Sequence, residues 1–224
     1  MKLYNTLTRQ VEDLQPLNAP RVGIYTCGPT VYDYAHVGHW FTYVRADLLI
    51  RALKGNGLEP EWVMNITDVG HLVSDADEGE DKLEKGARRE GKTAWEVARF
   101  YEADFLKELA LLNITKPNHI TRVTDHIAEQ IALVKVLEDK GFTYIIDDGV
   151  YYDTSKFPAY GDFARLDLDE LEAGKRVDFN PQKRHASDFA LWKFSPPGSQ
   201  RDMEWDSPWG KGFPGWHIEC SAMA

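Results

Sequence analysis

The sequence has 224 residues, of which 43% are hydrophobic and 28% are charged, a balance typical of a globular protein with one or two packed domains. The formal net charge of -10 argues against a chain that binds nucleic acid through bulk positive charge. No apolar run approaches the ~20 residues needed to cross a bilayer. The amino terminus also lacks the charged-then-apolar layout of a signal peptide. We therefore expect a cytoplasmic protein that does not enter a membrane.

A strand, a helix and a second strand are predicted in the first third of the chain. Residues 22–27 alternate apolar and small side chains, and a Gly-Pro turn follows them. Helical spacing predicts a helix from about His39, which the run Gly55-Asn56-Gly57 ends. The apolar residues at that spacing are Val44, Leu48, Leu49 and Ala52. Residues 61–66 then predict a second strand, so the unit is βαβ and its sheet is parallel.

The next segment is densely charged and leads into a long amphipathic helix. Residues 75–92 predict a solvated loop with a short helix, although their basic side chains are also candidates for contact with a phosphate. These side chains are Lys82, Lys85, Arg88, Arg89 and Lys92. Steps of three and four then mark a helix with Trp95, Ala98, Tyr101, Phe105, Leu109 and Leu112 on one face. We expect its aromatic residues in the core rather than on a base-stacking surface.

The composition changes after residues 113–117. A helix with Ile127, Ile131, Val134 and Leu137 on one face is predicted to end at Lys140-Gly141. Residues 142–146 and 150–153 flank Asp147-Asp148-Gly149, which predicts a β-hairpin. A further strand is expected at residues 188–194. We interpret this region as a separate α+β lobe.

The chain contains only two cysteines, Cys27 and Cys220, which are far apart in the sequence. A disulfide is not expected in a reducing compartment. The two thiols are therefore either buried free cysteines or metal ligands, and the count alone favours the first interpretation.

The run His36-Val37-Gly38-His39 lies just after a predicted strand, where a helix opens. Two histidines three residues apart project to one side of a helix. The helix N-terminus adds unpaired N–H groups and partial positive charge, which suits a polyphosphate. Gly38 allows a bulky group to approach the backbone. The motif alone is weak, since a pair of surface histidines is common.

Three separated motifs carry a resemblance to a known family. The run of residues 25–39, Tyr-Thr-Cys-Gly-Pro-Thr-Val-Tyr-Asp-Tyr-Ala-His-Val-Gly-His, resembles the signature of class I cysteinyl-tRNA synthetases. Residues 64–69, Met-Asn-Ile-Thr-Asp-Val, match that family again. So do residues 212–223, Gly-Phe-Pro-Gly-Trp-His-Ile-Glu-Cys-Ser-Ala-Met. The motifs occur in the family's order, and the resemblance spans essentially the whole chain.

The resemblance implies an α/β fold, namely a Rossmann-like class I synthetase catalytic domain whose parallel sheet is interrupted by an α+β connective insertion. Residues 1–112 would form the first half of the catalytic domain, residues 113–207 the inserted lobe, and residues 208–224 the start of the second half. The family's Lys-rich catalytic loop and helical anticodon-binding domain have no counterpart here. We therefore expect a truncated fold whose contacts with RNA come mostly from further C-terminal parts.

The resemblance also implies a cysteine–tRNA ligase. Cysteine would be activated with ATP and Mg²⁺ to cysteinyl-adenylate, and the cysteinyl group would then pass to tRNA(Cys). Position by position, His36 and His39 would stabilise the phosphates as catalytic residues. Gly38 would leave room for the adenine ring, and Thr30 would face ATP. Thr67 and Trp216 would line the amino-acid pocket, with a packed aromatic beside a helix start as the other interpretation of Trp216.

The same resemblance implies that Cys27 and Cys220 are thiolate ligands of one Zn²⁺ ion per chain. Cysteine and serine have nearly the same shape, so a pocket of ordinary contacts separates them poorly. A soft metal prefers sulfur, and zinc would therefore select the substrate thiol. His217 lies three residues before Cys220 and is a further candidate ligand. The family takes its remaining ligands from beyond Ala224, so we expect His217 to be structural or a hydrogen-bond partner.

Two other functions stay open. The related ligase that joins cysteine to an amino sugar in mycothiol synthesis shares the histidines and the cysteines. A truncated module that binds ATP or zinc without turnover is the non-catalytic alternative. Gly70 and His71 stand where many relatives carry acidic residues, and Trp40 is also less usual in the family. Whether Trp40 alters the ATP site is open at this stage.

Overall fold

The computed structural model describes residues 1–70, 82–165, 180–196, 198 and 201–224. The chain forms two compact units. Unit 1 contains residues 1–69, 86–125 and 224, and unit 2 contains residues 70–85 and 126–223. The division into a catalytic half, an inserted lobe and a second catalytic half at residues 112 and 207 stays a prediction.

The described strands are β1 (Lys2–Asn5), β2 (Gln10–Asp13), β3 (Arg21–Thr26), β4 (Glu59–Ile66), β5 (His119–Arg122), β6 (Thr143–Ile146), β7 (Gly149–Tyr152), β8 (Phe189–Phe194) and β9 (Gly212–Pro214). The α-helices are α1 (Val37–Gly55), α2 (Lys82–Glu90), α3 (Ala94–Leu111), α4 (Ile127–Asp139) and α6 (Trp216–Met223). Short 3-10 helices cover η1 (Val123–His126) and η2 (Thr154–Lys156).

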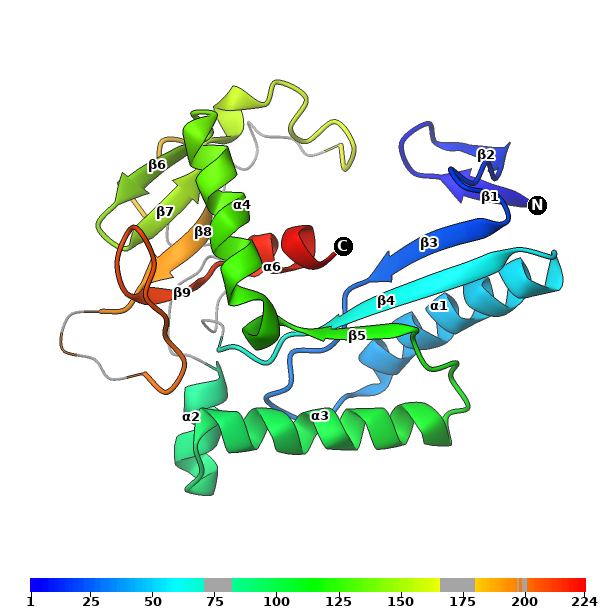
Figure 1. The fold of residues 1–224 in the computed structure, drawn as a ribbon, viewed down its shortest axis with the longest axis horizontal. Helices are drawn as coiled ribbons and strands as arrows, with labels where there is room; N and C mark the ends of the chain where they lie inside the picture. Colours follow the sequence, from blue (N-terminus) through cyan, green and yellow to red (C-terminus); the bar gives the residue numbers. More distant parts are fainter. Residues whose placement is uncertain (71–81, 166–179, 197, 199–200) are drawn as a thin grey trace. The chain divides into compact units, whose positions relative to one another are not determined.

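A parallel sheet in the order β3-β4-β5 is the centre of unit 1 (Figure 1). Strands β3 and β4 pair from Arg21 opposite Glu59 to Thr26 opposite Met64. Helix α1 joins them and packs along β4. The predicted βαβ unit and its parallel sheet are therefore confirmed.

Helix α1 begins and ends where the sequence predicts, but its buried residues differ from those that define the predicted spacing. Tyr43, Ile50 and Leu53 face the core, each 3% exposed or less. Val44 and Leu48, which define the helical spacing in the sequence, are 38% and 61% exposed. The spacing identified the helix but not its buried face, because α1 is apolar on more than one side.

Helix α3 confirms the long amphipathic helix predicted from residue 95. Tyr101 and Phe105 are 5% and 3% exposed, so both belong to the core as expected. Trp95 is 37% exposed in the first turn, and its expected burial is wrong. Trp95 lies at the edge of the buried face, to which Ala94 and Val97 of the same turn belong at 1% and 0% exposure. Helix α2 confirms the short helix of the charged segment, whose residues 75–81 lie outside the described residues.

Three buried carboxylates join segments of unit 1 that are distant in sequence. Asp47 of α1 accepts a hydrogen bond from the Thr115 backbone N–H at 2.9 Å. Glu102 of α3 binds the Arg122 guanidinium of β5 at 2.5 Å. Asp68, directly after β4, accepts from the N–H and hydroxyl of Thr124 at 3.0 and 2.6 Å. Burial nevertheless raises the pKa of the Asp68 carboxyl.

Strand β5 and the hairpin β1–β2 were not anticipated from the sequence. β5 contains a single aliphatic residue, Ile120, so it lacks the alternating pattern of a strand. β5 is stabilised as a strand by its parallel pairing with β4, which runs from Val63 opposite His119 to Ile66 opposite Arg122. The hairpin is mostly exposed, and its sequence shows no continuous apolar face.

Unit 2 is built on an antiparallel sheet in the order β6-β7-β8-β9, with α4 and α6 packed on it (Figure 1). The predicted hairpin is β6–β7, and the predicted helix and later strand are α4 and β8. The centre of the core contains Val134, Val150, Leu191, Trp192 and Ile218. The antiparallel sheet confirms the expected α+β insertion in a fold with a parallel sheet elsewhere.

Asp188 is the polar centre of unit 2. Its carboxylate is 2% exposed and accepts from the Tyr144 hydroxyl at 2.7 Å. It also accepts from the Thr154 N–H and hydroxyl at 2.9 and 2.8 Å, and from the His185 N–H at 3.0 Å. One side chain thus holds β6, η2 and the segment before β8.

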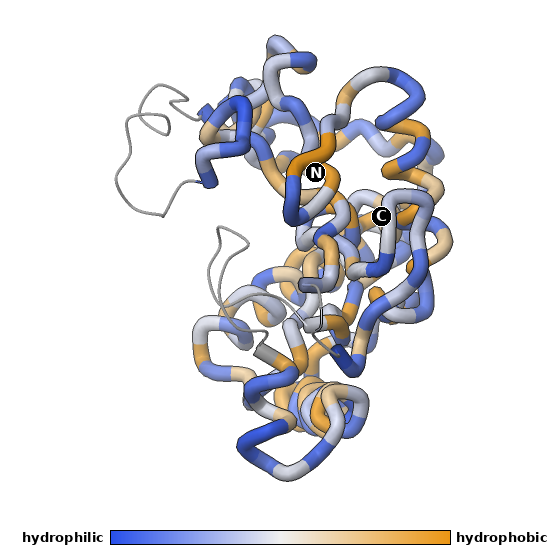
Figure 2. Tube along the Cα trace, turned by 90° about the vertical axis from the view of Figure 1, so that its left-hand side faces the viewer, coloured by the Kyte–Doolittle hydropathy of each residue, from blue (hydrophilic) through white to orange (hydrophobic). Residues whose placement is uncertain are grey.

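Hydrophobic and hydrophilic residues alternate along the tube in Figure 2. Among the described residues, no helix combines the length and the apolar character required to cross a membrane.

Asp188→Ala should lower the free energy of unfolding by about 3 kcal/mol, because it leaves buried donors without an acceptor. Tyr144→Phe removes one of these donors and should cost about 1 kcal/mol. Urea unfolding measures both values, with Asp162→Ala at an exposed position as the control. Equal stability of the Asp188 and Asp162 variants would contradict the assignment.

Candidate functional site

The segment from Cys27 to His36 connects β3 to α1 and is paired with the end of β4. Thr30 and Thr67 form a parallel bridge. The Val31 N–H donates to the Thr67 carbonyl at 3.1 Å, and the Thr67 N–H donates to the Pro29 carbonyl at 3.0 Å. The structure thus brings together two predicted site residues, Thr30 and Thr67, which lie far apart in the sequence.

Gly28 makes the closest approach in this segment. Its N–H donates to the Asn65 side-chain Oδ1 at 2.9 Å. A Cβ at this position would lie 1.7 Å from the Asn65 carbonyl oxygen. Only glycine therefore fits, because the neighbour is backbone and cannot turn away.

His36 and His39 cap the N-terminus of α1 reciprocally. The Gly38 N–H donates to His36 Nδ1 at 3.1 Å, and the His36 N–H donates to His39 Nδ1 at 3.2 Å. This arrangement is a capping box made of two imidazoles. The rings stack with centroids 3.9 Å apart and planes 20° apart.

The two caps determine which ring nitrogens carry the protons. In both imidazoles Nδ1 accepts a backbone N–H, so the proton of the neutral ring lies on Nε2. Burial, and then the charge of His36, lower the pKa of His39, which keeps His39 neutral at neutral pH. The geometry of the two caps therefore leaves each imidazole an Nε2–H donor for a ligand.

The electrostatics of the helix start favour an anion. The first turn of α1, which the structure describes in full, contains no acidic residue. The partial positive charge of the helix N-terminus is thus combined with two imidazole donors. Such a site can stabilise negative charge that develops on a phosphate.

Gly38 makes room for the His36 ring. A Cβ on Gly38 would lie 2.9 Å from His36 Cε1 and 3.1 Å from Nδ1. The glycine thus permits the cap itself, a role that the sequence did not indicate. The expected space for an adenine ring stays a prediction.

Asn65 is a functional candidate that the sequence analysis missed. Besides accepting from Gly28, its Nδ2 donates to the Thr67 hydroxyl at 3.2 Å. Asn65 and Thr67 are 1% and 2% exposed. Asn65 lies inside a quoted motif, and the available signal was a polar asparagine among the apolar residues at the end of a predicted strand.

Trp216 and His217 begin α6 in unit 2. Trp216 is 45% exposed. The His217 ring meets the Phe189 ring edge-on with centroids 4.6 Å apart. This packing supports the structural role expected for His217. The amino-acid pocket expected at Trp216 stays a prediction.

The two cysteines belong to different units. Cys27 is exposed directly after β3, and Cys220 is partly buried in α6. Burial, with a contribution from Cys27, raises the pKa of the Tyr43 hydroxyl, so the Cys27 thiol lies near α1. In the part of the chain that the structure describes, no three His, Cys, Asp or Glu side chains form a metal-binding group. The thiols suit zinc chemically, but these residues do not assemble a complete ligand set.

Comparisons with known proteins agree with this geometry. The family described as "tRNA synthetases class I (C) catalytic domain" matches residues 13–224. The "Cysteine--tRNA ligase 1" of Burkholderia lata is 57% identical over 224 residues, which are 100% of this chain and 47% of that protein. The "Cysteine--tRNA ligase" of Treponema denticola is 46% identical over 100% of this chain and 46% of its own length.

The match therefore identifies a class I aminoacyl-tRNA synthetase catalytic domain. The chain belongs to the (C) family of that class, and it spans about half the length of the curated relatives that it matches. The recognition based on three short motifs is thus confirmed.

Gly28→Ala should lower the free energy of unfolding by about 2 kcal/mol or more, because the new methyl group collides with backbone. Gly23→Ala is the matched control, since nothing lies within 4 Å of a Cβ at Gly23 in β3. Urea unfolding of both variants tests the difference. If Gly28→Ala is as stable as Gly23→Ala, the close approach of Gly28 to Asn65 is wrong.

Proposed function

We propose that the protein carrying this chain is a cysteine–tRNA ligase. The observation that carries the proposal is the pair of capped histidines at the start of α1, which presents two Nε2–H donors at a helix N-terminus. The pair occurs in a catalytic domain of the synthetase family. The name of the Burkholderia lata relative, "Cysteine--tRNA ligase 1", indicates the substrate.

The proposed reaction has two steps. The cysteine carboxylate attacks the α-phosphorus of ATP, with Mg²⁺ bound to the phosphates, and gives cysteinyl-adenylate and pyrophosphate. His36 and His39 donate from Nε2 to the phosphate oxygens whose charge increases during the attack. Thr30 and Gly38 lie on the ATP side. A hydroxyl of the terminal ribose of tRNA(Cys) then attacks the cysteinyl carbonyl, so that the cysteinyl ester forms and AMP leaves.

Selection of cysteine is proposed to rest on zinc. Cys27 and Cys220 would hold the ion as thiolates, and their softness suits a metal that prefers sulfur to a hydroxyl. The bound zinc would favour the substrate thiolate over the hydroxyl of serine. Thr67 and Trp216 would line the pocket for the amino acid. The remaining zinc ligands and most tRNA contacts would come from the half that the longer relatives possess. The charged tRNA would be used in the cytoplasm.

A hybrid protein tests the activity. This chain replaces the matching residues of the Burkholderia lata relative, and cysteine-dependent ATP–pyrophosphate exchange is measured. We expect robust exchange. Removal of the Nε2–H donors in His36→Asn, which keeps an N-cap acceptor, should lower kcat by about 10²-fold.

Lys107→Ala, at an exposed position of α3, is the control, and its rate of ATP–pyrophosphate exchange should equal that of the hybrid. No exchange by a folded hybrid would favour the non-catalytic alternative. Exchange followed by transfer to an amino sugar, but not to tRNA(Cys), would favour the mycothiol ligase. The 224-residue chain alone should exchange weakly or not at all.

Zinc content tests the metal assignment. The hybrid should hold about one zinc ion per chain, as a mononuclear site does. Cys27→Ala and Cys220→Ala should each lose most of the metal, because removal of one thiolate leaves an incomplete ligand set that binds zinc weakly. His217→Ala should keep it, since His217 packs against Phe189. Atomic absorption after dialysis measures the content. Full zinc content in either cysteine variant would overturn the assignment.

A further inference from the structure

Two aromatic residues flank the histidine pair, and the proposed function uses neither of them. Tyr34 lies two residues before His36, and Trp40 directly follows His39. Both rings pack against α3. The start of α1 is therefore held on either side by the same neighbouring helix.

Tyr34 packs against two consecutive aromatic rings of α3. Its ring meets Tyr101 edge-on, with centroids 5.1 Å apart and an angle of 89°. It meets Phe100 at 6.3 Å and 76°. Tyr34 is 56% exposed, so core burial does not hold it. These contacts do, since edge-to-face aromatic pairs are favourable at such distances.

Trp40 packs on the same helix one turn further along. Its ring stacks on Phe105 with centroids 5.2 Å apart and planes 11° apart. Tyr101 and Phe105 are four residues apart and therefore lie on one face of α3. We call Phe100, Tyr101 and Phe105 the aromatic ledge. The stacking of Trp40 on Phe105 joins the first turn of α1 to α3.

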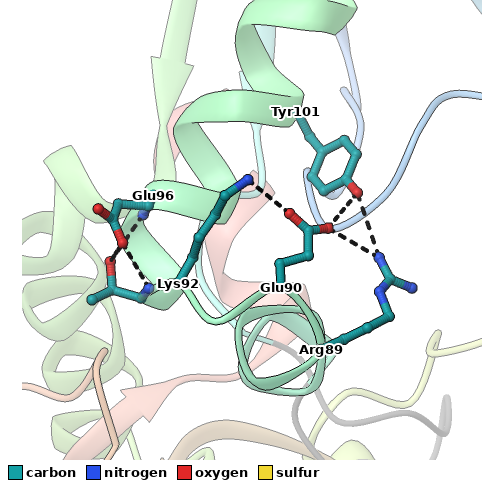
Figure 3. Close-up of polar contacts among 6 residues, drawn as sticks. Arg89, Glu90, Lys92, Glu96 and Tyr101 are labelled. Atoms are coloured by element: carbon teal, nitrogen blue, oxygen red, sulfur yellow. Dashed lines mark hydrogen bonds and ion pairs between the residues drawn. The ribbon is translucent and has the colours of Figure 1, made fainter.

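A polar cluster holds the ledge in place (Figure 3). The Glu90 carboxylate accepts from the Tyr101 hydroxyl at 2.8 Å, from Lys92 Nζ at 2.9 Å and from Arg89 Nη2 at 3.2 Å. Lys92 Nζ also lies 4.8 Å from the centre of the Phe100 ring. We call these contacts the Glu90 clamp. Two basic residues considered for phosphate contact are thus engaged within the protein.

The charge states of the clamp are stable around neutral pH. Hydrogen bonds from Lys92, Tyr101 and Arg89 lower the pKa of Glu90 to about 2. Burial, together with Glu90, raises the pKa of Tyr101 to about 12. Glu90 is therefore ionised and Tyr101 protonated, which keeps their hydrogen bond intact.

We propose that the aromatic ledge of α3, held by the Glu90 clamp, positions His36 and His39 for the nucleotide. Tyr34 and Tyr101 are the positioning residues. The part concerning the nucleotide rests on the proposed function. The connection of Tyr34 to α3 is independent of it.

The physical need for such a support follows from the site. Residues 33–36 are bend and coil after the Thr30–Thr67 bridge, and side-chain contacts such as those of Tyr34 help to order them. Ordering one backbone residue costs about 1–2 kcal/mol. Catalytic donors must also lie within roughly 0.5 Å of their productive position. The Tyr34 contacts restrict the chain two residues before the first imidazole.

Hydrogen exchange in the 224-residue chain tests the support directly. Tyr34→Ala should raise amide exchange at residues 31–40 by about tenfold, with the rest of unit 1 unchanged. Tyr101→Ala also removes a core ring, so it should raise exchange at residues 31–40 by at least as much and in the surrounding core as well. The double variant should exchange no faster at residues 31–40 than Tyr101→Ala alone. Tyr101→Phe keeps the ring and loses the bond to Glu90, so its exchange should be intermediate.

Tyr4→Ala is the matched control, because Tyr4 of β1 is 59% exposed. It should leave residues 31–40 unchanged. Wild-type exchange at these residues in both Tyr34→Ala and Tyr101→Ala would overturn the proposal. So would faster exchange throughout unit 1 in Tyr34→Ala, since that result indicates a general loss of stability.

The hybrid protein separates this inference from the proposed function. Tyr34→Ala should raise KM for ATP about fivefold and leave KM for cysteine unchanged, whereas loss of folded protein lowers only kcat. If the wild-type hybrid catalyses no ATP–pyrophosphate exchange, the proposed function is contradicted. Amide hydrogen exchange would in that case still test whether Tyr34 and Tyr101 order residues 31–40. Normal KM for ATP in an active Tyr34→Ala hybrid would overturn the positioning role.

Discussion

The pairing of residues 29–31 with Thr67 is the constraint on which the site depends. It resumes the parallel pairing of β3 and β4 past the end of β3, with one extra residue on the β3 side, and the Gly28 N–H donates to Asn65 Oδ1 in the stretch between. Because this pairing fixes the direction in which the chain leaves the sheet, it also fixes where α1 begins. The histidine caps and the Tyr34 contacts follow from that position.

Polar groups of unit 1 act as connectors as well as surface charges. Asp47, Asp68 and Glu102 are buried, and each binds a segment far along the chain. Such carboxylates are costly to bury unless they are paired, so their partners determine which segments meet. The net charge of -10 therefore says little about the site itself. The local field there comes from a helix N-terminus and two imidazoles.

The sequence predicted the regular elements well where periodicity was strong. Helices α1, α3 and α4, strands β3 and β4, and the hairpin at Asp148 follow from spacing and turn residues. Strand β5 was missed because only one of its four residues is aliphatic, so its sequence has no alternating pattern. Hydrogen bonds to β4 stabilise it as a strand instead. Trp95 was misplaced because periodicity identifies the buried face of a helix but not its width, and Trp95 lies at the edge of that face beside the buried Ala94 and Val97.

The sequence alone determined the family, because three ordered motifs containing His36, Thr67 and Cys220 seldom arise together by chance. It also determined that a glycine stands at residues 28 and 38. The tertiary structure decided why those glycines are needed, one against Asn65 and the other beneath the His36 ring. It also decided the tautomers of the histidines and the support of Tyr34 by α3. Most of these properties depend on distances between atoms that are remote in sequence, and the tautomers depend on the hydrogen bonds of the helix cap. The spacing of residues along the chain does not encode either.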